Sequence, residues 1–241
     1  GDLPVYELPL ADLPATVGQL EQLAGQHRQL LVLYRAAEES DPQQVVQGWL
    51  AEHAYPSREL WLGPVAAVSY LLPGGEADWH VTQPAADFGG QLTLRRVLQS
   101  SQTPAAGELL AVRLDWEASA QPAAAYSLFL QLLDADGQVV AQRDLPLRAD
   151  GLTSEGWQPG QQAATRAAIA LPASLAPGVY RLIAGLYDPQ SGARLPTAGA
   201  DHLDLGAIQL QPAAQPYAAE LSPLRFRPMH DFGEITLEGF D

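Results

Sequence analysis

The chain has 241 residues and carries 28 acidic against 13 basic side chains, a formal net charge of −15 at pH 7. It contains no cysteine, lysine or asparagine, so every basic side chain other than histidine is arginine. This charge opposes extended contact with a phosphate backbone and argues against nucleic acid as a partner. The missing cysteine excludes disulfides, thiolate metal ligands and a thiol nucleophile. No apolar run approaches the roughly 20 residues that a membrane span needs.

The first part of the chain alternates helix and strand patterns. Apolar residues at spacings of three and four predict a helix over residues 13–26, and a short apolar run predicts a strand over residues 29–35. Asp41 is a suitable N-cap residue and Pro42 suits a first helical position. Together they predict a second helix that continues to about His53.

A second strand-forming stretch completes this part. Residues 59–72 are apolar and rich in strand formers, with an interruption at Gly63 and Pro64. The resulting order is helix, strand, helix, strand, and about 70 residues with so few strands make a marginal core. We therefore expect residues 1–73 to form a small α/β subdomain that is the end of a larger soluble region.

After Pro73 and Gly74 the pattern changes to short strands. Residues 108–116 alternate strictly, with Leu110, Val112, Leu114 and Trp116 on one face and polar residues on the other. Further strands are predicted over residues 126–133, 138–142, 164–171, 179–187 and 203–210. Short strands separated by Gly, Pro and Asp turns predict an antiparallel, jelly-roll-like β-sandwich over residues 74–212, so the fold class is mainly β.

A short repeat marks the C-terminal region. The sequence DFGGQLTL at residues 87–94 returns as DFGEITL at residues 231–237. Residues 213–241 are therefore predicted to be a linker and the first strand of a second sandwich. The match is short enough for coincidence to be the alternative.

Several motifs follow one another across residues 29–210. They are the run from Tyr126 to Gln142, Trp157-x-Pro159-Gly160, Pro177-Gly178-x-Tyr180-Arg181-Leu182, Gly185-Leu186-Tyr187-Asp188-Pro189 and Gly192-Ala193-Arg194-Leu195, preceded by Leu31-Val32-Leu33-Tyr34-Arg35, Trp49-Leu50 and Trp61-x-Gly63. In this order they resemble the C-terminal extracytoplasmic region of bacterial multi-pass membrane glycosyltransferases similar to dolichyl-phosphate-mannose protein mannosyltransferases.

The resemblance implies a division of labour in the parent protein. Its catalytic carboxylate and lipid-phosphate site would lie in the membrane domain, and the parent would use a lipid-linked sugar donor. The present segment would be non-catalytic, need no cofactor, lie on the extracytoplasmic face, and meet the membrane only through spans upstream. Family members often carry a histidine at Gln131 and an aspartate near Thr165 and Arg166, so any ligand role of those positions is in doubt here.

Carbohydrate recognition needs aromatic faces for stacking and polar groups for the hydroxyls. The candidates on predicted loops are Trp157, Trp79, Tyr187 and Asp188. Two of them have a structural alternative: Trp157 as a cap on one end of the sandwich, and Trp79 as packing at the domain junction. The expected partner is a carbohydrate or glycan acceptor. Trp116 lies on the same apolar strand face as Leu110, Val112 and Leu114, so we expect it in the core.

No other chemistry stands out. Asp134 and Asp136 fit a hairpin turn better than a calcium loop, because the remaining ligands are missing. The histidines lack metal-ligand spacing, and no nucleophile elbow or phosphate loop occurs, so we expect no metal site and no catalytic residue. Two other functions stay open: a free-standing carbohydrate-binding module and a purely structural spacer.

Overall fold

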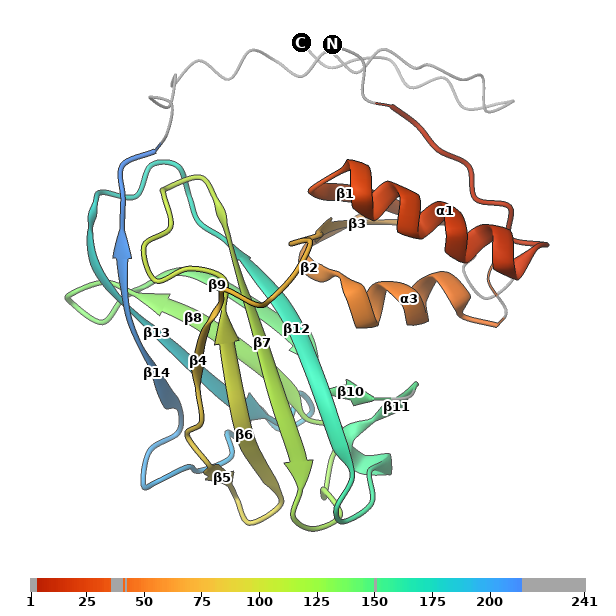
Figure 1. The fold of residues 1–241 in the computed structure, drawn as a ribbon. Coiled ribbons are helices and arrows are strands. Elements are labelled where there is room, and N and C mark those ends of the chain that lie inside the picture. Colours follow the sequence, from red (N-terminus) through yellow and green to blue (C-terminus); the bar gives the residue numbers. More distant parts are fainter. Residues whose placement is uncertain (1–3, 36–40, 42, 150, 214–241) are drawn as a thin grey trace.

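The computed structural model describes residues 4–35, 41, 43–149 and 151–213, which form a small α/β unit beside a β-sandwich (Figure 1). The α/β unit contains helices α1 (Leu13–Gln26) and α3 (Val45–His53) and strands β1 (Gln29–Arg35), β2 (Tyr55–Leu62) and β3 (Val65–Leu71). The rest is almost entirely antiparallel strand. The predicted fold class, a mainly β chain with a sandwich after a small α/β part, is confirmed.

In both helices an aspartate carboxylate accepts hydrogen bonds from backbone N–H groups of the first turn. The Asp12 carboxylate accepts a hydrogen bond from the backbone N–H of Ala15 at 3.1 Å, and α1 begins where the sequence predicts. Asp41 also caps, but α3 begins later than expected, at Val45. The Asp41 carboxylate reaches forward to the N–H groups of Val45 and Val46 at 2.8 and 3.0 Å. The predicted position of Pro42 as the first helical residue lies outside the described residues.

The three strands of the small sheet are ordered β1-β3-β2, all antiparallel. One face packs on the two helices around Leu20, Leu50 and Leu72. The stretch predicted as a single interrupted strand is a hairpin, because Gly63 adopts a left-handed φ of 59° and turns the chain back. On the opposite face the leucine side chains are 50–62% exposed: Leu31, Leu33, Leu60 and Leu62.

The sandwich consists of two sheets. The first has the order β12-β7-β6-β4, with β5 also paired to β6, and the second has the order β14-β13-β8-β9. The strands are β4 (His80–Thr82), β5 (Ala86–Phe88), β6 (Leu92–Gln99), β7 (Leu109–Ala118), β8 (Ser127–Leu133), β9 (Val139–Pro146), β12 (Gln162–Ala170), β13 (Gly178–Tyr187) and β14 (Leu203–Leu210). The chain crosses between the sheets after β7, β9 and β12, as in a jelly roll. A small ribbon of β10 (Arg148–Ala149) and β11 (Leu152–Thr153) and the 3-10 helix η1 (Ser154–Gly156) fill the second crossover.

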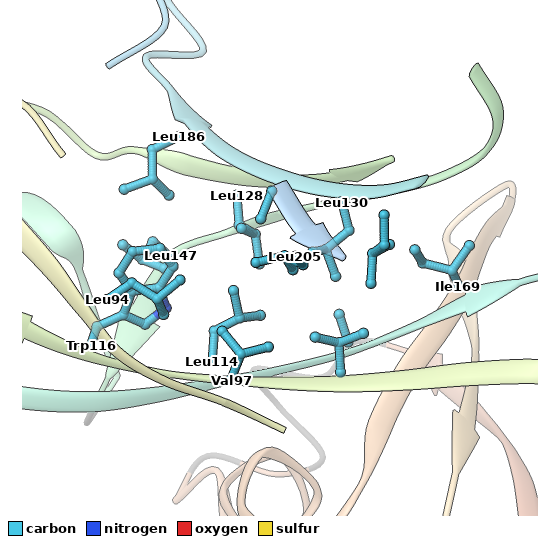
Figure 2. Close-up of a cluster of buried hydrophobic side chains, with 14 of the residues drawn as sticks. Leu94, Val97, Leu114, Trp116, Leu128, Leu130, Leu147, Ile169, Leu186 and Leu205 are labelled. Carbon is cyan, nitrogen blue, oxygen red and sulfur yellow. The ribbon is translucent and has the colours of Figure 1, made fainter. Parts of the chain in front are cut away.

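The core lies between the two sheets. Figure 2 shows side chains from both layers pointing toward one another, among them Leu114 and Trp116 of β7 and Leu128 and Leu130 of β8. The alternation predicted for β7 is confirmed, since its apolar face is buried and Arg113 and Asp115 lie on the other face. Strand β9 continues four residues beyond its predicted end.

The predicted repeat begins at a real structural feature. Residues 87–94 form the β5–β6 hairpin, in which Gly89 and Gly90 have φ values of 62° and 71°. The Asp87 carboxylate accepts a hydrogen bond from the N–H of Gly90 at 2.8 Å. The second copy at residues 231–237 lies outside the described residues.

Candidate functional site

Trp157 does not present a stacking surface. It follows η1, its side chain is 0% exposed, and it belongs to the sandwich core with Leu147 and Trp116. An indole with no exposed face cannot stack on a sugar, so the prediction of Trp157 as a carbohydrate-binding residue is corrected to a core role. The glycine- and glutamine-rich sequence around it resembles an exposed loop, but the ring is buried in the core.

Trp79 lies at the junction between the two parts of the chain. Its half-buried ring packs on the Tyr55 ring with centroids 5.1 Å apart and planes inclined by 49°. Around this pair, Ala111 of β7 and Ala168 of β12 complete a small apolar cluster. The ring therefore connects the small sheet to the outer face of the sandwich, which is the alternative that the sequence left open.

Tyr187 and Asp188 lie at the end of β13, and both side chains form hydrogen bonds with other residues of the chain. The Tyr187 hydroxyl donates to the Asp144 carboxylate at 3.2 Å. Asp188 accepts hydrogen bonds from the Ser191 hydroxyl at 2.6 Å and the Gln190 N–H at 2.9 Å, and these bonds lower the pKa of its carboxyl. Asp188 thus closes its own turn. The structure does not gather the four predicted residues into one site, and a carbohydrate-binding role for Tyr187 and Asp188 stays a prediction.

A groove of about 420 Å³ lies where helix α3, the small sheet and the edge of the sandwich meet. Its volume is within the usual range of ligand sites. The lining side chains come from β1, α3, β2, β3, β9, β10 and β12: Tyr34, Gln47, Leu50, Ala51, Ala54, Pro56, Glu59, Trp61, Ala66, Val68, Tyr70, Leu145, Pro146, Arg148, Ala164, Thr165 and Arg166.

Strand alternation places an aromatic and a carboxylate side by side on the groove wall. Trp61 and Glu59 of β2 are opposite Ala66 and Val68 of β3, so all four lie on the sheet face that lines the groove. Trp61 is 65% exposed, unlike the core tryptophans. An exposed aromatic ring, which the sequence predicted at Trp157, is therefore found at Trp61.

Two tyrosines stand deeper in the groove. The hydroxyls of Tyr34 on β1 and Tyr70 on β3 are 3.0 Å apart. Burial is the main cause that raises the pKa of both phenols above the usual value, so both stay neutral at physiological pH. Neutral hydroxyls can donate and accept hydrogen bonds, as sugar hydroxyls require.

The sandwich edge contributes polar groups to the opposite wall. Arg148 of β10 is exposed, and Arg166 of β12 donates from Nη1 to the carbonyl of Ala51 in α3 at 3.1 Å. Thr165 is only 5% exposed, and its hydroxyl has no partner among the described residues. Thr165 is paired with Leu114 of β7, on the face of β12 that points into the sandwich core, so its hydroxyl does not face the groove.

A network of charges holds the two walls together. The Glu76 carboxylate, in the connection between β3 and β4, accepts hydrogen bonds from the Tyr55 hydroxyl and from Nη1 of Arg113 at 2.9 Å. Its other neighbour is Nε of Arg166 at 3.8 Å. Asp115 then accepts from Nε of Arg113 at 2.7 Å. The orientation of the small sheet on β7 and β12 is therefore fixed by polar as well as apolar contacts.

Sequence reasoning missed Trp61 as a site residue, although its motif entered the resemblance. The signal was available in the alternation of Glu59 and Trp61, which places both on one strand face. Within residues 4–35, 41, 43–149 and 151–213, no cluster of three potential metal ligands is found. Over the same residues, no helix is long and apolar enough to cross a bilayer.

No family model and no curated protein matches the chain. Among solved structures it is similar to the C-terminal domain of wzt, with 16% identity over 60% of this chain and 92% of that one and a TM-score of 0.33. It is also similar to a calcium-binding mutant of Bacteroides uniformis β-glucuronidase 2, with 12% identity over 58% of this chain and a TM-score of 0.30. The match covers 15% of the glucuronidase, so the chain spans a small part of that enzyme. Identities and TM-scores this low identify neither a family nor a function.

Proposed function

We propose that this segment is a non-catalytic carbohydrate-recognition part of a membrane glycosyltransferase-like protein, placed on the extracytoplasmic face, and that the groove binds its glycan acceptor. The observation that carries the proposal is the exposed indole of Trp61 beside polar groups in a concave site. The sugar's C–H face would stack on Trp61, and its hydroxyls would bond to Glu59 and Gln47.

The lining supports recognition rather than hydrolysis. Glu59 is the only carboxylate among the described residues that line the groove. Glycoside hydrolysis usually needs two carboxyl groups on either side of the scissile bond, one as acid and one as base or nucleophile. A single carboxylate suits a hydrogen-bond acceptor for sugar hydroxyls.

The groove separates the proposal from a purely structural spacer, but not from a free-standing carbohydrate-binding module. A purely structural spacer has no need of a concave site with an exposed indole and two tyrosine hydroxyls. A free-standing carbohydrate-binding module would use the same groove, so binding data alone do not separate it from the proposal. The flanking coding sequence does: upstream membrane spans support the glycosyltransferase-like parent, and a chain without them supports the free module.

The binding experiment starts with a glycan array and continues with calorimetry on the glycans that bind. Trp61→Ala should weaken binding about tenfold or more, because stacking and apolar burial are lost. Leu60→Ala is the matched control, since Leu60 is the next residue of β2, is 50% exposed and lies on the opposite face. The proposal fails if no glycan binds above background, or if Trp61→Ala binds as tightly as the unchanged protein.

A further inference from the structure

We infer that the groove selects anionic sugars, meaning glycans whose residues carry a carboxylate or a phosphate, through arginines at its sandwich wall. This inference rests on the proposed function, because it names the class of glycan that the same groove takes. Three observations carry it: the excess of arginines over acids among the lining residues, the lack of a carboxylate partner for Arg148 among the described residues, and the position of the lining arginines on the wall opposite Trp61.

The residues that line the groove include more arginines than acids, unlike the chain as a whole. The protein has a net charge of −15. The described lining residues nevertheless include two arginines, Arg148 and Arg166, against one acid, Glu59. In a chain with more than twice as many acidic as basic side chains, a site where arginines outnumber acids is a local exception. It would concentrate anions against the repulsion of the remaining surface.

Arg143 adds a third guanidinium beside this wall. It lies on β9 opposite Leu130, at a position that shares the inward face with the groove residue Leu145. Its side chain is half-buried, and Nε is buried without a partner among the described residues. Burial is the main cause that lowers the pKa of Arg143, and electrostatic interactions with Glu59, Tyr70 and Asp144 oppose that effect.

Arginines elsewhere in the sandwich are paired. Arg95 and Arg96 of β6 contact carboxylates of β7 at 2.9 and 2.7 Å, and Arg113 contacts two. Among the described residues, Arg143 and Arg148 have no ion pair within 4.0 Å and no side-chain hydrogen bond. The exposed guanidinium of Arg148 is therefore open to a ligand, whereas Nε of Arg143 is buried and Arg166 is partly neutralised by Glu76.

The geometry of a guanidinium matches that of an anionic sugar. Arginine offers parallel N–H groups that bind a carboxylate or phosphate in a bidentate manner. A uronic acid carries its carboxylate at the rim of a ring whose face is apolar enough to stack. Trp61 on one wall and the arginines on the other can engage these two features together. Glu59 would then accept a ring hydroxyl and disfavour an anion placed on its own side of the groove.

The test compares matched glycans by calorimetry: a galacto-oligosaccharide, the oligogalacturonate of the same length, and a phosphorylated oligosaccharide. The uronate and phosphate arms show which anion is preferred. We expect at least one anionic probe to bind about tenfold or more tightly than the neutral one, a preference that falls with added salt. Arg148→Gln should remove most of this preference, measured as the ratio of the dissociation constants of the neutral and anionic probes.

The controls separate charge selection from folding and from the proposed function itself. Arg58→Gln makes the same charge change on β2 but on the opposite face from Glu59, so it should leave the preference intact. Arg143→Gln should also reduce the preference, with thermal unfolding recorded for each variant. If neutral and anionic probes bind with equal affinity while Trp61→Ala still weakens binding, anion selection is overturned and glycan binding by the groove is supported. Absence of binding by every probe overturns both.

Discussion

The hydroxyl of Tyr34 on β1 lies 3.0 Å from the hydroxyl of Tyr70 on β3, so two strands of the small sheet share one hydrogen bond within the groove. Burial raises the pKa of both phenols, and likewise that of Tyr55 at the junction. These raised values have consequences for stability at alkaline pH.

Because the folded-state pKa of each of these tyrosines lies above the unfolded value near 10, the neutral form is favoured by folding. The stability that they contribute is fully present below about pH 10 and is lost as the pH rises toward their folded-state values. We expect tyrosinate absorbance from Tyr34, Tyr55 and Tyr70 to appear only together with loss of the circular dichroism signal. Tyr34→Phe should move that transition to higher pH. Ionisation of all eight tyrosines near pH 10 in an intact fold would contradict this expectation.

Removal of the Glu76 charge should loosen the junction. Glu76→Gln keeps the shape of the side chain but weakens its contacts with Arg113 and Arg166, whose side chains are largely buried. We expect a loss of about 1–3 kcal/mol in the free energy of unfolding, measured by urea denaturation. Glu117→Gln is the control, because its partner Arg95 is half-exposed, and it should cost less than about 1 kcal/mol. Equal effects of the two substitutions would argue against a special role for Glu76.

The contrasting tryptophans give a second stability test. Trp157→Ala should destabilise the sandwich by about 3–5 kcal/mol because it leaves a cavity in the core. Trp61→Ala should change stability by no more than about 0.5 kcal/mol, since the ring is mostly in solvent. The comparison uses denaturant unfolding of the two variants. A stable Trp157→Ala variant that had lost glycan binding would restore Trp157 as a site residue.

Gly185 of β13 is required by the neighbouring ring of Phe129 on β8. A Cβ at this position would lie 2.2 Å from Cζ of Phe129, and Arg194 holds the ring from another side, with its guanidinium carbon 4.3 Å from the ring centroid. Gly185→Ala should therefore cost about 1–3 kcal/mol. Gly48→Ala in α3 meets no heavy atom within 4 Å and should instead stabilise the helix by about 0.5–1 kcal/mol. Thermal unfolding of both variants checks the opposite signs.

Local sequence patterns predicted helices and strands well where the period of the apolar residues is clear. Alternation from Leu110 to Trp116 identified the buried face of β7, and the 3.6-residue period identified α1. The predicted start of α3 was wrong. Gln44 takes a left-handed φ of 54°, so the helix begins only at Val45, and the Asp41 carboxylate reaches forward to the N–H of that residue.

The groove lay beyond such patterns. Trp61 and Arg166 are more than a hundred residues apart, and their strands are brought together by long-range contacts: the packing of Tyr55 and Trp79 on Ala111 and Ala168, and the polar contacts of Glu76. No local spacing encodes that packing. Trp157 was misplaced for a related reason, because a polar loop sequence does not reveal whether its one large ring turns toward solvent or toward the core.

The walls of the groove belong to two parts of the chain that meet through Glu76 and Tyr55. A ligand that touches both Trp61 and Arg148 would bridge them, so its binding and the association of the two parts are thermodynamically linked. At a concentration one hundred times its Kd, such a ligand adds about 2.7 kcal/mol to the stability of the assembled form. The linkage also runs in the other direction: any change that loosens the junction lowers the affinity for the ligand without altering a single residue that contacts it.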